Sequence, residues 1–219
     1  MAADLWLQMP AWQYLKDKMI LNTINIQGTQ RLSAQEIMDI TGIAPQMDIM
    51  SIDLSVVKNR LEENPWVENA EIRRIIPDIL TITIQEAIPS ALWINNKDAF
   101  LVSRQGRVLD KVNNLKEYKN YLMLFGNNAP SEHIKIYDTL YRSAFFSDIL
   151  SISRVGNRRW DVYLRKRVVI KLPEKAGVEV VAAVDELLRK NAETSKELQM
   201  LDMRLFPEKI FVKYAKAAD

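Results

Sequence analysis

The stretch from Pro65 to Glu86, PWVENAEIRRIIPDILTITIQE, decides the fold of the first half of the chain. Leu80, Ile82 and Ile84 alternate with polar residues, which is the period of two expected when one strand face is buried and the other is solvated. The segment before Pro77 has the composition of a partner strand. The stretch therefore predicts a short β-hairpin with a proline-bearing turn.

Two helices are predicted ahead of the hairpin. Asp53 is placed to accept the first backbone N–H groups of a helix whose apolar residues recur at helical spacing as far as Leu61. Ser33 and Glu36 form a capping box that opens an earlier helix, and residues 22–27 alternate enough to form a strand. The order strand, helix, helix, strand, strand buries one face of a sheet under two helices.

Strands dominate the rest of the chain. Short alternating runs separated by turn residues continue as far as Tyr214, with helices opening at Pro130 and Gly177. We expect one long, mostly antiparallel sheet with helices on one face, which makes the fold class α+β. The predicted buried side of the first of these helices consists of Ile134, Tyr137, Leu140, Tyr141 and Ala144.

The order and spacing of several motifs carry a family resemblance. Pro-Trp-Val, a strand ending in Arg-Arg, Pro-Asp, a strand ending in Glu and then PSALW at residues 89–93 follow one another. INIQG at 24–28 and LSAQEI at 32–37 lie upstream, and LDMR at 201–204 and IFV at 210–212 lie downstream. The chain resembles the extracytoplasmic portion of the FtsQ/DivIB family of bacterial cell-division proteins.

The resemblance divides the chain into three parts. Residues 1–21 are expected to be a juxtamembrane lead-in, residues 22–88 a POTRA domain and residues 89–219 an FtsQ-type β-domain. The family carries a membrane helix before its POTRA domain, and that helix is absent from this chain. The lead-in has apolar residues spaced to share one face, so it is either a juxtamembrane stub or an ordinary N-terminal helix packed on the domain: Leu5, Trp6, Met9, Trp12, Leu15 and Met19.

Composition excludes several classes of protein. With 219 residues, 48% hydrophobic and 26% charged, the chain can form folded cores without a bias toward disorder. The net charge of +2 is too small to indicate a polyanionic partner, and the lack of cysteine excludes disulfides and thiolate metal sites. Apolar runs are far shorter than the roughly 20 residues of a membrane-spanning helix. We therefore expect no nucleic-acid partner and no spanning segment within this chain.

Few residues offer catalytic chemistry. The only histidine, His133, lies in the first turn of a predicted helix without a neighbouring cysteine or second histidine, and we expect it to be exposed or to cap the helix. The six glycines are too scattered for a phosphate-binding loop, and there is no Gly-x-Ser-x-Gly motif. We expect no enzyme activity, no metal and no cofactor.

A basic cluster in the second domain has several interpretations. Solvated strand faces, an acidic protein partner and phosphate binding all fit arginine-rich strands, but stacking aromatic residues are not interleaved with the cations. An acidic partner outranks nucleic acid because of the family resemblance. The cluster consists of Arg154, Arg158, Arg159, Arg165, Lys166, Arg167 and Lys171, with Asp161 as its only acid.

The last strand suggests a mechanism of partner binding. If it lies at a sheet edge, an extended peptide can add itself as the next strand. Phe211 and Lys213 would lie on one face and Ile210, Val212 and Tyr214 on the other, unless Phe211 and Tyr214 are simply core residues. The turn before this strand is one residue longer than in the enterobacterial pattern, so the register of residues 210–214 could slip by one.

The resemblance implies the partners. In the family, the last strand and an arginine just before a tryptophan receive FtsB, which comes paired with FtsL. That arginine corresponds to Arg158, two positions before Trp160, and the arginine of the family's Asp-x-Arg motif corresponds to Arg204. The candidate site is therefore Arg158, Arg204 and residues 210–214. A strand of the POTRA hairpin is linked to recruitment by upstream division proteins such as FtsK, which adds Asn69, Ile72 and Arg74. For Ile72, ordinary packing against the helices is the favoured interpretation.

The sequence leaves three functions in competition. The first is a non-catalytic divisome scaffold that binds FtsB and FtsL, in the periplasmic portion of a single-pass inner-membrane protein at the septum. The second is a POTRA-type docking module in polypeptide transport or outer-membrane protein assembly. Those proteins have tandem POTRA repeats or a following barrel, and neither is present here. The third is nucleic-acid binding through the basic cluster.

Overall fold

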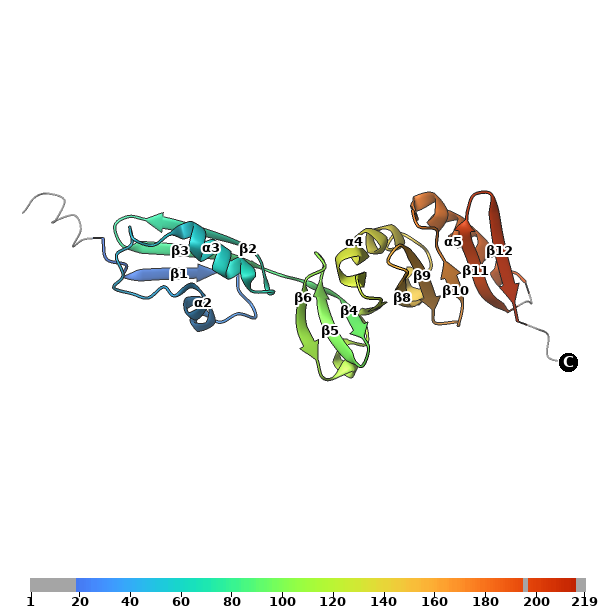
Figure 1. Ribbon diagram of the computed structural model, residues 1–219, viewed down its shortest axis with the longest axis horizontal. Helices are drawn as coiled ribbons and strands as arrows, with labels where there is room; N and C mark the ends of the chain where they lie inside the picture. The colour runs from blue at the N-terminus through green and yellow to red at the C-terminus, as the bar shows by residue number, and fades with distance from the viewer. Residues whose placement is uncertain (1–18, 195–196, 216–219) are drawn as a thin grey trace, which may run out of the picture. The chain divides into compact units, whose positions relative to one another are not determined.

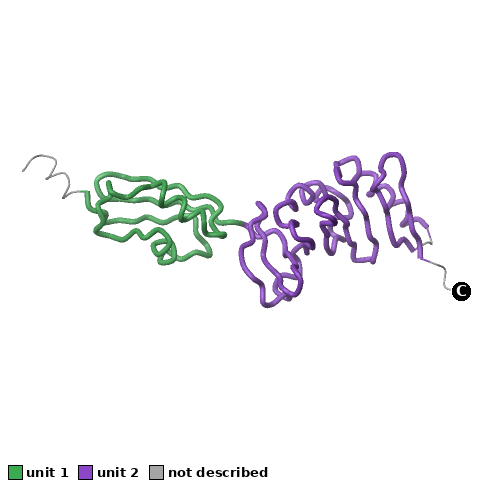
Figure 2. Tube along the Cα trace, in the orientation of Figure 1, with its two compact units in different colours: residues 1–87 green, residues 88–219 purple. Residues whose placement is uncertain are grey.

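The computed structural model describes residues 19–194 and 197–215. The chain divides into two compact units between Ala87 and Ile88, one residue before the boundary expected from the sequence (Figure 2). Most of the predicted amphipathic lead-in falls on residues 1–18, outside the described residues. Leu21, at the end of that predicted lead-in, is fully buried in the core of the first unit.

The first unit is a three-stranded sheet with two helices (Figure 1). Its strand order is β1-β3-β2, with β1 parallel and β2 antiparallel to the central β3. The predicted order of elements is confirmed. The elements are β1 (Thr23–Gln27), α2 (Ala34–Thr41), α3 (Leu54–Glu63), β2 (Val67–Ile75) and β3 (Ile79–Glu86).

Local signals define the ends of these helices. Ser33 and Glu36 form the predicted capping box of α2, and Asp53 accepts from the backbone N–H groups of Ser55 and Val56 at the start of α3. Alternate residues of β3 are buried beneath the helices, as the period of two predicts, because they belong to the core of this unit.

The second unit is built on a nine-stranded sheet. The strand order is β12-β11-β10-β9-β8-β7-β4-β5-β6; five neighbouring pairs are antiparallel and three are parallel. The strands are β4 (Pro89–Asn95), β5 (Asp98–Ser103), β6 (Val108–Val112), β7 (Leu122–Phe125), β8 (Ile149–Val155), β9 (Arg159–Leu164), β10 (Val169–Lys171), β11 (Leu198–Leu205) and β12 (Lys209–Tyr214). The helices are α4 (Ala129–Leu140) and α5 (Val178–Ala192), with short 3₁₀ helices at η2 (Leu115–Tyr118) and η3 (Phe146–Asp148).

Helices α4 and α5 cover one face of this sheet (Figure 1). Buried residues of both helices share a core with alternate residues of β8 to β11, including Ile152, Val162, Ile170 and Leu201. The residues between them in sequence face the opposite, helix-free side, called here the bare face. A charged side chain on β8 to β11 can therefore reach solvent only from the bare face or from a strand end.

The predicted buried side of α4 is wrong in part. The helix buries Ala129, His133, Ile136 and Leu140, whereas Tyr141 is 63% exposed. Tyrosine rings carry both apolar and polar character, so the pattern of apolar residues alone does not fix which side of this helix faces the sheet. The aromatic side of α4 is thus left at the surface.

Candidate functional site

The strand β12 ends the nine-stranded sheet in the described part of the chain. It pairs with β11 only, in antiparallel register, and no strand lies beyond it in the sheet order. One row of its backbone N–H and C=O groups therefore points away from the sheet, which is the arrangement that accepts an added strand.

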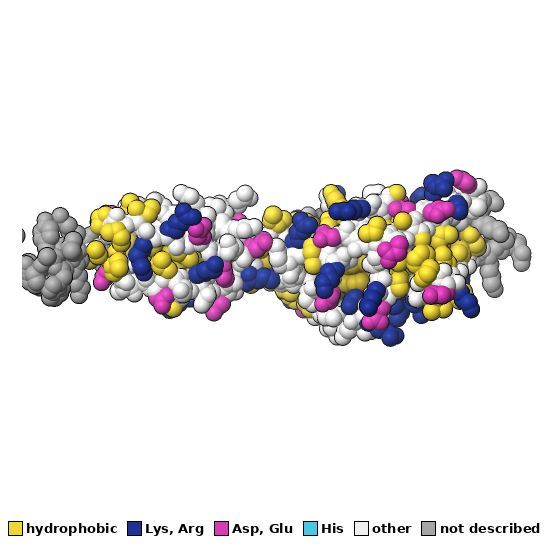
Figure 3. All heavy atoms as spheres, turned by 90° about the horizontal axis from the view of Figure 1, so that it is seen from above, with side chains coloured by type: hydrophobic (Ala, Val, Ile, Leu, Met, Phe, Trp, Pro, Cys, Tyr) yellow, Lys and Arg dark blue, Asp and Glu magenta, His cyan; other side chains and the backbone are white. Residues whose placement is uncertain are grey.

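The side chains of β12 are exposed along its whole length. Val212 lies opposite the buried Leu201, so it belongs to the helix side, and Phe211 lies opposite Asp202 on the bare face. The core interpretation of Phe211 and Tyr214 is wrong, because these side chains are 52% and 37% exposed. Hydrophobic side chains also gather on the surface toward the C-terminal end of the second unit (Figure 3).

The other sheet edges are less suited to an added strand. The edge strands β2 and β6 each expose one large apolar side chain, Ile75 and Val108, and the edge strand β1 exposes none, while β12 exposes four. At the β2 edge, the outward N–H of Ala70 already donates to the Glu62 carboxylate, 3.1 Å away. Among the described strands, β12 therefore combines an end position with the most extensive apolar surface.

Arg204 is held on the bare face by Asp202. Its Nε and Nη2 atoms donate to the carboxylate over 2.8 and 2.7 Å, in a two-pronged pair. Asp202 is 5% exposed, and the Arg204 hydrogen bonds lower the pKa of its carboxyl group while the pair raises the pKa of Arg204. The guanidinium is thus a fixed cation beside the start of β12.

A second arginine–aspartate pair, with a single hydrogen bond, lies two strands away. Arg159 donates to Asp161 over 3.4 Å, and Lys171 lies between the two aspartates because it is in register with both Asp161 and Asp202. This charge network was not predicted from the sequence. An arginine and an aspartate two residues apart in a strand share a face, and that spacing is the signal that could have identified it.

The predicted basic cluster does not form one continuous stripe. Arg158 is exposed in the turn between β8 and β9, at the same end of the sheet as Arg204. Arg154 packs over the ring of Trp160 with 5.1 Å to its centroid, and Trp160 itself is a core residue. Arg165, Lys166 and Arg167 lie at the opposite end, in the turn between β9 and β10.

The three residues predicted on the β2 edge have different environments. Asn69 is exposed, whereas Ile72 is half-buried against the core of the first unit, as the packing interpretation expects. Arg74 donates from Nε to the Ile49 carbonyl over 2.8 Å and from Nη2 to the Ile52 carbonyl, so it fastens a loop to the sheet. Of these three side chains, Asn69 is the one that is exposed to solvent, whereas Ile72 packs on the core and Arg74 holds a loop.

The expectation that His133 is exposed or caps a helix is wrong. It is fully buried, with Nδ1 at 2.7 Å from the Pro130 carbonyl and Nε2 at 2.9 Å from the Ser90 hydroxyl. A carbonyl oxygen can only accept, so Nδ1 carries a proton, and because burial favours the neutral imidazole, Nε2 is left to accept from the Ser90 hydroxyl. Burial lowers the pKa of His133 below its ordinary value. This polar pair explains how a histidine occupies a core position of α4.

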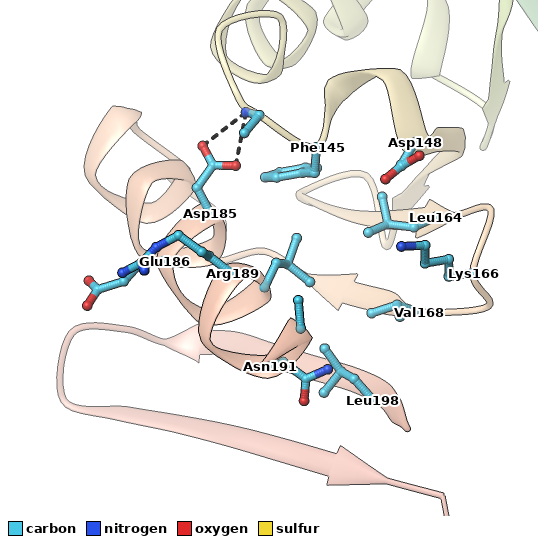
Figure 4. A pocket seen from close by; sticks show the side chains of 13 residues that line it. Phe145, Asp148, Leu164, Lys166, Val168, Asp185, Glu186, Arg189, Asn191 and Leu198 are labelled. Carbon is cyan, nitrogen blue, oxygen red and sulfur yellow. Dashed lines mark hydrogen bonds between the residues drawn. The ribbon is translucent and has the colours of Figure 1, made fainter. Parts of the chain in front are cut away.

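A further pocket of 610 Å³ lies between α5, the α4–β8 connection and the β9–β10 turn (Figure 4). Phe145, Leu164 and Leu198 line it with apolar side chains, and the Asp185 carboxylate accepts from the backbone N–H of Ala144 at 3.0 Å. No histidine or hydroxyl side chain is among its lining residues. Within the described residues, no three His, Cys, Asp or Glu side chains are grouped to hold a metal ion.

None of the helices in the described ranges is long and apolar enough to cross a membrane.

The sequence matches two family models, the FtsQ-type POTRA domain over residues 19–87 and the C-terminal domain of cell division protein FtsQ/DivIB over residues 91–204. Strand β12 lies after the second match.

The individual relatives share less than a third of their aligned residues with this chain. Cell division protein FtsQ of Rickettsia felis is 28% identical over 185 residues, which cover 84% of this chain and 68% of the relative. FtsQ of Rhizobium meliloti is 24% identical over 186 residues, 84% of this chain and 60% of the relative. The solved extracytoplasmic domain of DivIB from Geobacillus stearothermophilus is 14% identical, covers 49% of this chain and 93% of its own, and has a TM-score of 0.34.

Proposed function

Because this chain belongs to the FtsQ/DivIB family of cell-division proteins, we propose that it is a non-catalytic scaffold of the divisome that captures FtsB, paired with FtsL, by strand addition at β12. The observation that carries the proposal is the position of β12 at the sheet end with four exposed large apolar side chains. Backbone pairing supplies adhesion and the side chains select the partner.

Tight binding of the partner requires both backbone pairing and side-chain contacts. A partner strand along β12 makes about three to six backbone hydrogen bonds at about 0.5–1.5 kcal/mol each, whereas association costs about 4–15 kcal/mol. Backbone pairing alone therefore does not give tight binding. Ile210, Val212 and Tyr214 on the helix side and Phe211 on the bare face supply apolar area for the remainder.

The cations near the start of β12 indicate which charge the partner segment should carry. Asp202 engages Nε and Nη2 of Arg204, which leaves the Nη1 side of the guanidinium for a partner carboxylate. Arg158 is exposed at the same end of the sheet, and Lys213 adds a cation within β12. A partner segment with acidic residues before or within its added strand fits this distribution.

The first unit is proposed to receive upstream division proteins such as FtsK at the β2 edge. Exposed Asn69 supports this role, while Ile72 and Arg74 contribute by shaping the strand that carries it. We also propose, from the family resemblance, that this portion lies in the periplasm, anchored in the inner membrane by a preceding helix and concentrated at the septum. A polypeptide-transport or outer-membrane assembly role gains no support, because both family models that match are of the FtsQ type.

A matched pair of variants tests the capture of FtsB. Val212 on β12 and Val108 on β6 are valines on the two opposite edge strands of one sheet, 40% and 38% exposed. Val212→Asp should abolish binding of a synthetic FtsB periplasmic peptide in calorimetry, because the added strand would bury an unpaired carboxylate. Val108→Asp should bind as the unmodified chain does, and both should keep their circular dichroism. Equal binding by the two variants would refute the proposal.

A further inference from the structure

The second unit has a pocket of 570 Å³ that the proposed capture of FtsB does not use. Tyr121, Tyr137 and Tyr141 line it, and we call it the tyrosine pocket. Its wall also includes Pro89 at the start of β4. Four of the chain's seven tyrosines gather here when Tyr118, which packs against Tyr121 at 5.8 Å between ring centroids, is included.

The aromatic rings of the pocket are held in place. Tyr137 and Tyr141 stack with 5.9 Å between centroids and 20° between planes, and both pack edge-on against Phe146 at 5.4 and 5.2 Å. Tyr141 remains 63% exposed, although it is fixed on two sides. A rigid, exposed aromatic surface loses little entropy when a ligand packs on it.

The charges of the pocket cancel. Its only charged side chains are Arg104 and Asp138, which pair with each other over 3.2 Å. The remaining polar groups are the tyrosine hydroxyls, the Asn120 amide and Ser90. Partial burial raises the pKa of Tyr137, so its phenol stays protonated as a donor. This lining matches an uncharged ligand with apolar rings and accessible acceptors.

The topology decides between two kinds of peptide. Strands β4, β5 and β7 all lie inside the sheet, so the pocket offers no free strand edge for an extended peptide. A polyproline II segment makes no backbone hydrogen bonds of its own, and its carbonyl groups accept from side-chain donors while its proline rings pack between aromatic rings. We propose that the tyrosine pocket binds an uncharged, proline-rich segment of a partner protein in the polyproline II conformation.

The test uses the full chain and a fluorescein-labelled decaproline peptide, followed by fluorescence anisotropy. Binding should be saturable, and it should weaken about tenfold in Tyr141→Ala, because an aromatic contact is lost. Tyr141→Phe should bind as the unmodified chain does, since it keeps the ring. Tyr163→Ala is the matched control, because Tyr163 lies on β9 outside the pocket.

Two further probes separate this proposal from its alternatives. A glycine-serine peptide of equal length should not bind, and neither should the neutral oligosaccharide cellohexaose. Preference for either probe over decaproline, or unchanged decaproline binding in Tyr141→Ala, would overturn the proposal. Val212→Asp should bind decaproline normally, so failure of the FtsB interaction and failure of this one are distinguishable.

Discussion

The hydrogen bond between Ser90 and His133 gives a prediction that can be worked through from the structure. Ser90→Ala removes the donor to a fully buried Nε2 atom, and an unsatisfied buried acceptor costs about 1–3 kcal/mol. Ser90 is only half-buried, so water can reach part of the space and the lower half of that range is expected. For a unit of this size, about 1–2 kcal/mol lowers the melting temperature by several degrees.

The same contact makes the stability of the second unit depend on pH. Burial lowers the pKa of His133 below 6.5, so the folded state binds this proton less readily than the unfolded chain does. The neutral imidazole contributes fully to the free energy of unfolding above pH 6.5. This contribution is lost as the pH falls through that value toward the lowered pKa of the folded state. Since His133 is the only histidine, this window belongs to one side chain.

Hydrogen exchange of the α4 and β4 amides measures both effects in the intact chain. The opening free energy in these elements should fall between pH 8 and pH 5 in the unmodified protein and should start lower at pH 8 in Ser90→Ala. His133→Gln should show a flat profile over the same range. Unchanged protection in Ser90→Ala at pH 8, or a flat profile with the histidine present, would contradict the assigned hydrogen bond and tautomer.

Three further predictions concern other contacts. Arg74→Ala should cost the first unit about 1–3 kcal/mol through two lost hydrogen bonds to loop carbonyls, and thermal denaturation should show more loss than in Arg74→Lys. Gly28 has φ +84° and faces the Ile84 carbonyl, so Gly28→Ala should cost about 1–3 kcal/mol in chemical denaturation, and an unchanged midpoint would contradict this. Hydrogen bonds from Arg204 lower the pKa of Asp202. The ionised Asp202 carboxylate therefore stabilises the folded state above pH 3.8, and this stabilisation is lost as the pH falls through the pKa of the folded state. Acid titration of Asp202→Asn should lack that part of the acid transition.

Features encoded within a few residues could be predicted from the sequence. The capping box at Ser33, the N-cap at Asp53 and the alternation in β3 depend on neighbours along the chain, and all three are confirmed. The family resemblance, the α+β class and the order of elements in the first unit are confirmed as well.

Features that depend on distant partners could not be predicted. The parallel pairing of β7 with β4 and β8 joins segments separated by helices and turns, and no local pattern specifies it. The buried position of His133 depends on Ser90, 43 residues earlier in the chain. The Lys171 contribution to the charge network likewise requires the register of three strands. The roles of Arg158, Arg204 and residues 210–214 in partner binding stay predictions.

The most direct test of strand addition is amide hydrogen exchange of β12 with and without the FtsB peptide. A partner strand must accept from the outward N–H groups of β12, so exchange in residues 209–214 should slow on binding while exchange in β6 at the opposite edge stays the same. Saturable binding of the peptide with the β12 amides still exchanging at their unbound rates would contradict the account.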